Sequence, residues 1–208
     1  MRTIELFCGT KSFSTVAARY GFDAFTVDIE PLFRPYLVAD ILHLDAAKLP
    51  RRPLILWASP PCEAFSVAAI GKNWHPDGAP KHPRAVAAQK LVAKTLAVIR
   101  EVRPVWWFIE NPRGMLRTLP LMRGLSRRTV TYCQYGDIRQ KPTDIWTNAA
   151  WWKPLRPCSP GAACHEAAPR GSRSGTQGLK RREDRARIPH ALFEELFRQC
   201  PTQAREAA

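Results

Sequence analysis

The sequence predicts an α/β fold with a doubly wound, mostly parallel sheet, and two patterns carry that prediction. The first is a set of short apolar runs at residues 3–7, 24–28, 36–39, 54–58 and 105–109. These runs are nearly unbroken, as expected for parallel strands that helices cover on both faces. The second pattern is the helical spacing or turn residues between the runs, which indicate right-handed crossover connections.

The clearest helix is expected at residues 84–102, between the fourth and fifth runs. Its apolar residues repeat at helical spacing: Ala88, Leu91, Val92, Leu96, Ile99 and Val102. Pro104 follows, and proline cannot continue a helix. The pattern therefore places one helix between two parallel strands.

The second half of the chain is less regular. Runs at residues 129–133 and 144–147 are expected to extend the sheet. Residues 149–187 are rich in Pro, Gly, Arg and Ser without periodicity, which indicates an irregular basic insertion. An amphipathic helix is expected at 189–199. The chain thus divides into a main domain (1–148), the insertion (149–187), and a C-terminal helix that returns to the main domain, with its tail (188–208).

The charge of the chain points to a polyanionic partner. Lysine and arginine total 32 against 18 acidic residues, a net charge of +14. Residues 1–110 carry 14 basic and 10 acidic side chains (+4), whereas residues 111–208 carry 18 and 8 (+10). Such a field attracts nucleic acid; a basic surface that only maintains solubility is the alternative.

Apolar runs and cysteines indicate the compartment. No run approaches the ~20 residues that span a bilayer, and no apolar leader begins the chain. The six cysteines lie at irregular spacing, unlike a disulfide framework. We therefore expect a cytoplasmic protein with reduced cysteines and no membrane contact.

Gly9, Asp28 and Asp40 stand where the first three strands are expected to end, at the ligand-binding edge of an open parallel sheet. Glycine permits the backbone to approach a ligand closely. A carboxylate after the second strand can accept hydrogen bonds from ribose hydroxyls, and one after the third can reach an adenine amino group. Taken alone, each acid is as readily explained as a side chain that caps the end of its strand as by a ligand-binding role. The three together favour a bound nucleoside.

A cysteine and a glutamate follow the fourth and fifth strands. Two prolines stiffen the turn that presents Cys62 at the ligand edge, and a cysteine on a rigid loop there is a candidate nucleophile. Glu110 directly follows the fifth apolar run. An acid at this position can protonate or hydrogen-bond a ring nitrogen while a thiolate attacks the ring.

These motifs, in this order, resemble those of the DNA cytosine-5 methyltransferases. They read "ELFCGTKSFS", "VDIE", "VADI", "ASPPCEAFS", "FIENPRG" and "YGDIRQKP", over residues 3–148, with a weaker echo at 188–196. The most specific part is "PPC" followed by "EN" at the end of the next strand. The chain looks similar to the small phage-encoded members. The resemblance implies a Rossmann-like fold that binds S-adenosylmethionine.

The resemblance also implies roles for individual residues. The cofactor would lie against residues at the first four strand ends: Phe7, Cys8, Gly9, Thr10, Ser12, Asp28, Ile29, Asp40, Ile41 and Pro60. Cys62 would add to carbon 6 of cytosine while Glu110 stabilises the protonated ring nitrogen 3, so that carbon 5 accepts the methyl group. Arg139 and Lys141 would supply positive charge near the cytosine carbonyl and phosphate, although "RQKPT" departs from the usual Gln-x-Arg-x-Arg.

The implied substrate is double-stranded DNA with one cytosine flipped out, because neither ring carbon is reachable inside a stacked duplex. We expect a monomer. Two alternatives stay open: a non-catalytic methyltransferase-like protein that binds nucleic acid, and the same chemistry on RNA or a free nucleotide. The insertion at 149–187 is short for target recognition, and its basic run at 170–182 suits phosphate contacts. Sequence specificity is therefore expected to be short or loose.

Cys158, Cys164 and His165 in the insertion raise the question of a zinc site. Their spacing is not that of a standard cysteine pair, and the fourth ligand is open, with Cys133 as one candidate. Cysteine and histidine ligands that are neighbours in the chain are sterically awkward. From the sequence we therefore assign no metal ligand.

Overall fold

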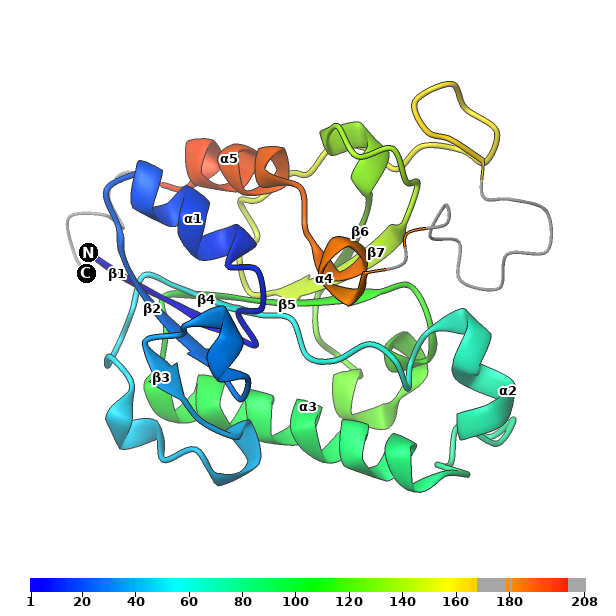
Figure 1. Ribbon diagram of the computed structural model, residues 1–208, viewed down its shortest axis with the longest axis horizontal. Coiled ribbons are helices and arrows are strands. Elements are labelled where there is room, and N and C mark those ends of the chain that lie inside the picture. Colours follow the sequence, from blue (N-terminus) through cyan, green and yellow to red (C-terminus); the bar gives the residue numbers. More distant parts are fainter. Residues whose placement is uncertain (168–178, 180, 202–208) are drawn as a thin grey trace.

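The computed structural model describes residues 1–167, 179 and 181–201, and a seven-stranded sheet lies at its centre (Figure 1). The strands are β1 (Arg2–Leu6), β2 (Asp23–Asp28), β3 (Leu37–Val38), β4 (Ile55–Ala58), β5 (Trp106–Pro112), β6 (Arg127–Thr131) and β7 (Pro142–Thr147). Their order across the sheet is β3-β2-β1-β4-β5-β7-β6. Strands β1 to β5 pair in parallel, and β7 is antiparallel to both β5 and β6. The predicted mostly parallel sheet is confirmed.

Helices cover both faces of the sheet. On one face α1 (Ser12–Arg19) packs against α5 (His190–Gln199), and α3 (Pro83–Val102) crosses the other face (Figure 1). Side chains alternate between the two faces, because successive residues of a strand point in opposite directions. The α3 side therefore receives Leu56 and Ile109, and the α5 side receives Trp57 and Phe108. Two short helices, α2 (Ile70–Asn73) and α4 (Arg182–Ala186), complete the set.

The strand boundaries differ from the predicted ones by one to three residues, and three of these differences have a clear structural cause. Strand β3 ends early because the Asp40 side chain accepts a hydrogen bond from the Leu42 amide and starts a 3₁₀ turn. Strand β5 continues through Glu110 because its pairing with β7 extends to Pro112. Strand β6 ends at Thr131, where a 3₁₀ turn begins.

The topology brings several loops to one edge. Strands β1 to β5 run in the same direction. Strand β7 runs opposite to β5, and β6 runs opposite to β7, so β6 has the same direction as β5. The loops after β1, β2, β4, β5 and β6 therefore leave the same edge of the sheet, where open α/β sheets bind ligands.

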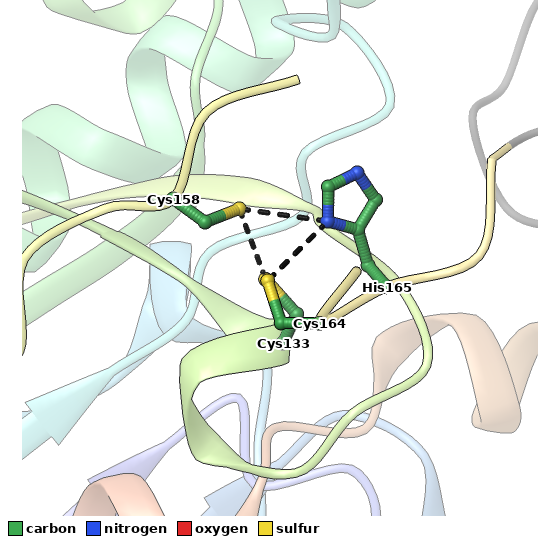
Figure 2. A group of neighbouring side chains, drawn as sticks. All are labelled: Cys133, Cys158, Cys164 and His165. Atoms are coloured by element: carbon green, nitrogen blue, oxygen red, sulfur yellow. Dashed lines mark hydrogen bonds between the residues drawn. The ribbon is translucent and has the colours of Figure 1, made fainter. Parts of the chain in front are cut away.

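The first part of the predicted insertion folds back onto the loop between β6 and β7. The Cys158 amide donates to the Thr131 hydroxyl at 3.0 Å, and the Glu166 amide donates to the Ile138 carbonyl at 2.9 Å. Cys158 thereby comes to lie beside Cys133 (Figure 2). The predicted basic run at 170–182 falls largely on residues outside the described part of the chain.

No helix among residues 1–167 and 181–201 combines the length and apolar character that crossing a membrane requires.

A buried glutamate holds the start of α1. Lys11 occupies the N-cap position with a left-handed backbone and makes no side-chain cap. Instead, the carboxylate of Glu5 in β1 accepts hydrogen bonds from the amides of Phe13 (3.2 Å) and Ser14 (2.9 Å). Burial raises the pKa of Glu5 from 4.5 to about 7, against the hydrogen bonds from Ser14 and Phe13, which lower it.

Glu5 is expected to make the folded state less stable as the pH rises from 4.5 to about 7. Within that window the folded state holds a proton that the unfolded state has lost, so stability is highest below pH 4.5 and falls through the folded pKa. The full effect is about 3 kcal/mol. Urea unfolding of the wild type at pH 5 and pH 7.5, compared with Glu5→Gln, measures it. The same pH dependence in both proteins would contradict the assignment.

Candidate active site

The turn between β1 and α1 has an unusual backbone. Phe7 (φ 58°), Gly9 (φ 45°) and Lys11 (φ 57°) all lie in the left-handed region. Glycine adopts this conformation at little cost, whereas Phe7 and Lys11 carry a Cβ and are strained. Strain of this kind persists where surrounding contacts hold it, and it is concentrated at ligand sites. The turn therefore has the character of a binding loop.

Asp28 joins the ends of β1 and β2. One carboxylate oxygen accepts a hydrogen bond from the Gly9 amide at 2.8 Å, and the other accepts from the Glu30 amide at 2.9 Å. Each oxygen keeps a second lone pair for a ligand hydroxyl. The neighbouring Ile29 is 64% exposed, so an apolar side chain stands open beside the carboxylate. This combination suits a sugar with an attached ring.

The other residues predicted at the first strand end differ in how deeply they are buried. Cys8 and Ser12 are buried, and Thr10 is half-buried with its hydroxyl 3.1 Å from that of Ser12. The Ser12 hydroxyl also accepts from the Ile188 amide at 3.4 Å. Burial raises the pKa of Cys8 to about 12, so this thiol is a packing group.

At the third and fourth strand ends, Asp40 is half-buried and caps the following turn. The Ile41 side chain is buried in the core beneath α3. Pro60 is buried as well, and its carbonyl accepts from the Asn111 side chain at 2.9 Å.

Cys62 lies half-exposed on the turn after β4. Its carbonyl accepts hydrogen bonds from the amides of Phe65 and Ser66, both at 3.0 Å. The loop after β5 braces this turn, because Gly114 pairs with Ser66 and the Met115 amide donates to the Phe65 carbonyl at 2.8 Å. A Cβ on Gly114 would lie 2.1 Å from the Phe65 carbonyl oxygen, so a side chain at this position forces the turn to move.

Glu110 is buried in β5, and two hydroxyls contact its carboxyl group. The Tyr132 hydroxyl donates to it at 2.8 Å, and Ser59 also hydrogen-bonds to it. Burial raises the pKa of Glu110, while the charge of Lys141 and the two hydroxyls lower it in part. The carboxyl group therefore keeps its proton to a higher pH than an ordinary glutamate.

Cys62, Glu110 and Lys141 influence one another electrostatically. Burial raises the pKa of Cys62, the negative charge of Glu110 raises it further, and the positive charge of Lys141 opposes both. Burial lowers the pKa of Lys141, and attraction to Glu110 and Cys62 raises it. The structure thus brings the predicted nucleophile, the predicted acid and one predicted cation into a single site.

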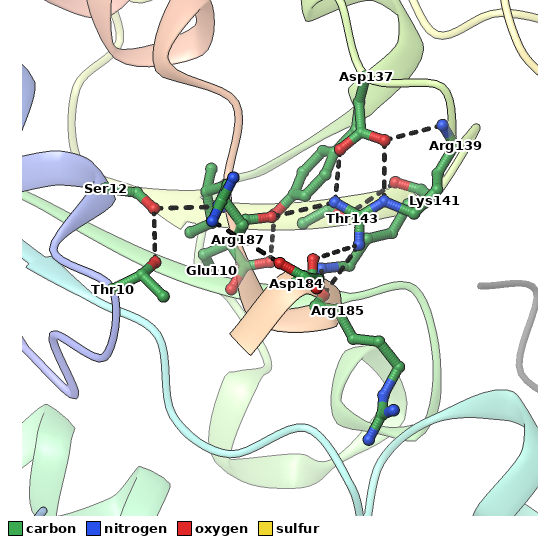
Figure 3. Close-up of polar contacts among 12 residues, drawn as sticks. Thr10, Ser12, Glu110, Asp137, Arg139, Lys141, Thr143, Asp184, Arg185 and Arg187 are labelled. Carbon is green, nitrogen blue, oxygen red and sulfur yellow. Dashed lines mark hydrogen bonds and ion pairs between the residues drawn. The ribbon is translucent and has the colours of Figure 1, made fainter. Parts of the chain in front are cut away.

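The two predicted cations make different contacts (Figure 3). The Lys141 ammonium lies 4.6 Å from the centroid of the Tyr132 ring and donates to the Arg185 carbonyl at 2.9 Å. The buried Arg139 guanidinium forms an ion pair with Asp137 and donates to the carbonyls of residues 184, 185 and 187. In this structure Arg139 holds the α4 segment, and the charge of Lys141 acts on the Glu110 carboxyl group.

Three further residues of the site were not predicted from the sequence: Tyr132, Ser59 and Gly114. The signal for Tyr132 was available, because this residue follows β6 at the same sheet edge as the other candidates. Ser59 lies directly after β4 and also accepts from the Trp57 ring nitrogen at 2.9 Å. Gly114 carried no signal of its own, since its importance comes from a contact with a loop 49 positions earlier, at Phe65.

Comparisons with known proteins agree on one family. The chain is 29% identical over 220 residues to a probable DNA (cytosine-5)-methyltransferase of Frog virus 3 (isolate Goorha), with 96% of this chain and 100% of that relative covered.

Among solved structures it is similar to a prophage-encoded E. coli protein described as a DNA modification methyltransferase (18% identity, TM-score 0.51). It is also similar to the Entamoeba histolytica methyltransferase EhMeth (12% identity, TM-score 0.52). These matches cover 71% and 75% of this chain but 46% and 55% of those chains, so the chain spans about half their length and the likeness concerns the fold.

The model of one family, C-5 cytosine-specific DNA methylase, matches residues 1–119, which is more than half of the 208 residues. The same match contains the strand-end residues from Gly9 to Glu110 described above. Members of this family use S-adenosylmethionine as the methyl donor. The chain belongs to the C-5 cytosine-specific DNA methylase family.

Proposed function

We propose that this protein methylates carbon 5 of cytosine in DNA through a covalent adduct to Cys62. The observation that carries the proposal is that a half-exposed Cys62, a buried Glu110 with a raised pKa and Lys141 interact electrostatically at one edge of the sheet. A protein that only binds nucleic acid needs neither the nucleophile Cys62 nor the acid Glu110.

The residues at the first two strand ends fit S-adenosylmethionine. The Asp28 carboxylate has lone pairs for ribose hydroxyls, the exposed Ile29 offers apolar surface to the adenine ring, and Gly9 lets the backbone come close. When bound, this cofactor supplies the methyl group that carbon 5 of cytosine accepts. The Asp40 carboxylate and the Ile41 backbone lie farther along the same edge.

In the proposed reaction the Cys62 thiol first gives its proton to water, and Lys141 stabilises the resulting thiolate. The sulfur then forms a bond to carbon 6, the electrons of the ring shift toward nitrogen 3, and Glu110 gives nitrogen 3 its proton. Carbon 5 becomes nucleophilic and accepts the methyl group. A water molecule takes the carbon-5 proton and the nitrogen-3 proton returns to Glu110, which restores the ring and expels the thiolate.

The two hydroxyls on Glu110 position its carboxyl group for that transfer. Tyr132 and Ser59 hold the group in one orientation, and preorganised groups in a buried site need little rearrangement as charge develops. The target cytosine reaches this site only after leaving the DNA stack.

Side-by-side incubation of DNA, RNA and free deoxycytidine nucleotides with radioactive cofactor tests the proposal. Label in DNA that chromatographs as 5-methylcytosine after nuclease digestion is expected. Label in RNA or nucleotide alone would assign the chemistry to another substrate, and binding of nucleic acid without label would indicate a non-catalytic protein. Bisulfite sequencing of the methylated DNA is expected to show a short or loose recognition sequence.

Asp28→Ala is expected to weaken cofactor binding by about 1–3 kcal/mol, because it removes the acceptor for the ribose hydroxyls and releases the Gly9 amide. Calorimetric titration with S-adenosylhomocysteine measures the change. Asp23→Ala is the matched control, since Asp23 begins the same strand at the opposite edge and its side chain is exposed. Equal affinities in the two variants would remove Asp28 from the site.

Gly114→Ala is expected to lower kcat by about 10²-fold, because displacement of the Cys62 turn by even one ångström misaligns the nucleophile. Gly71→Ala in α2 is the control, since a Cβ there meets nothing within 4 Å. Steady-state methylation and thermal unfolding of both variants separate misalignment from loss of the fold. Wild-type kcat in Gly114→Ala would show that the brace is dispensable.

A further inference from the structure

Four metal-ligating side chains converge outside the active site. Cys133 lies on the 3₁₀ turn Tyr132–Tyr135 after β6, and Cys158, Cys164 and His165 come from the insertion (Figure 2). One ligand atom from each lies within 4.8 Å of all the others. We propose that these four residues bind one Zn²⁺ ion as a tetrahedral Cys₃His site.

The distances between the ligand atoms match those around zinc. Zn–S bonds of about 2.3 Å and Zn–N bonds of about 2.0–2.1 Å at tetrahedral angles place two sulfurs about 3.8 Å apart, and a sulfur and a nitrogen about 3.6 Å apart. The Cys133 sulfur lies 3.2 Å from that of Cys158 and 3.6 Å from that of Cys164. The His165 Nδ1 atom lies 3.6 Å from the sulfurs of both Cys158 and Cys164. Of these four separations, only that between the Cys133 and Cys158 sulfurs departs from the zinc geometry, by about half an ångström.

The backbone resolves the difficulty of neighbouring ligands. Gly161 has a φ of 82°, and the Ala162 amide donates to the Ser159 carbonyl at 3.2 Å, so the chain doubles back before Cys164. This turn lets Cys164 and His165 reach one point although they are adjacent in the sequence. The steric objection that the sequence raised against a metal site does not apply to this path.

Two of the three sulfurs accept hydrogen bonds of the kind that supports a metal ligand. The side-chain amide of Gln134 donates to the Cys164 sulfur and that of Gln140 donates to the Cys158 sulfur, both at 3.3 Å. Outer hydrogen bonds of this kind orient metal ligands and stabilise them. The sulfur separations exceed the ~2.05 Å of a disulfide, so Cys133, Cys158 and Cys164 are not joined to one another by disulfide bonds. Thiolate and imidazole ligands in a tetrahedral set select zinc among common metals.

Four protein ligands leave no open position, so the ion is structural. It would fasten the insertion to the loop between β6 and β7. Cys133 directly follows Tyr132, whose hydroxyl holds Glu110, so the same ion steadies a residue that positions the catalytic acid.

Metal analysis of the full-length protein, purified without chelator, tests the proposal independently of methylation. One zinc per chain is expected, with X-ray absorption showing about three sulfurs at about 2.3 Å and one nitrogen at about 2.0–2.1 Å. Replacing zinc by Co²⁺ should produce the intense visible absorption of a tetrahedral thiolate site. These measurements use the wild-type protein, so they do not depend on whether a ligand variant folds.

Cys158→Ser and His165→Ala are expected to lose the zinc. Cys200→Ser and His75→Ala are the matched controls, because neither residue belongs to the cluster, and both should keep one zinc per chain. Three results would overturn the proposal: less than about a tenth of a metal equivalent in the wild type after growth with zinc, a disulfide between two of the three cysteines, or zinc content unchanged in both ligand variants.

Discussion

Cys62→Ser is expected to abolish methylation, with kcat reduced by about 10³-fold or more. A serine hydroxyl ionises far less readily than a thiol, and oxygen is a weaker nucleophile toward an electron-poor ring carbon. The substitution is small, and Cys62 lies on a turn fixed by backbone hydrogen bonds, so the fold and the cofactor site should remain. Affinity for S-adenosylhomocysteine should therefore stay within a few-fold of the wild-type value.

Trapping on DNA that contains 5-fluorocytosine supplies the decisive readout. Fluorine at carbon 5 cannot leave as a proton does, so the wild-type enzyme should remain covalently attached after methyl transfer. Cys200→Ser should trap like the wild type, because Cys200 lies beyond α5 in the core and outside the site. No adduct is expected with Cys62→Ser. An adduct mapped to a different residue would refute the assignment of the nucleophile.

Glu110→Gln is expected to lower kcat by about 10²–10⁴-fold, the usual contribution of a positioned acid. Glutamine has nearly the same shape and can still accept the hydrogen bond from Tyr132, so the buried hydroxyl keeps a partner. What it cannot do is release a proton to ring nitrogen 3. Steady-state methylation at saturating DNA measures the loss, and unaltered kcat would remove Glu110 from the chemistry.

The same variant should change the pH profile of kcat/KM. Activity requires the Cys62 thiolate, whose fraction grows as pH rises toward its raised pKa, and protonated Glu110, whose fraction falls as pH rises through its raised pKa. The wild-type profile is therefore bell-shaped. Glu110→Gln retains the thiolate requirement alone, so its profile should rise and level off. A bell-shaped profile that persists in the variant would assign the alkaline limb to another group.

Tyr132→Phe serves as the companion variant for that profile. The Tyr132 hydroxyl lowers the pKa of Glu110, so its removal should raise that pKa and move the limb of the profile that Glu110 sets to higher pH. Loss of activity without any movement of the limb would indicate a purely structural role for the hydroxyl.

Most of the fold was predictable because its information is local. Unbroken apolar runs mark strands that are buried on both faces, and the α3 pattern marks a helix with one buried stripe. The boundaries that differed depend on partners instead: β5 reaches Pro112 because β7 pairs with it, and β3 stops because Asp40 caps the next turn. Neither partner is visible in the local pattern.

The sequence by itself determined the parallel strands, their common ligand edge, and the residues at or near that edge, including Asp28, Cys62 and Glu110. Tertiary structure decided how distant segments meet: Tyr132 on the acid, Gly114 beneath the nucleophile's turn, and the insertion beside Cys133. The physical reason is that periodicity records which side of an element is buried. Which distant residue a side chain contacts depends on the order of strands in the sheet and on the path of each loop. That order and those paths form only when the whole chain packs.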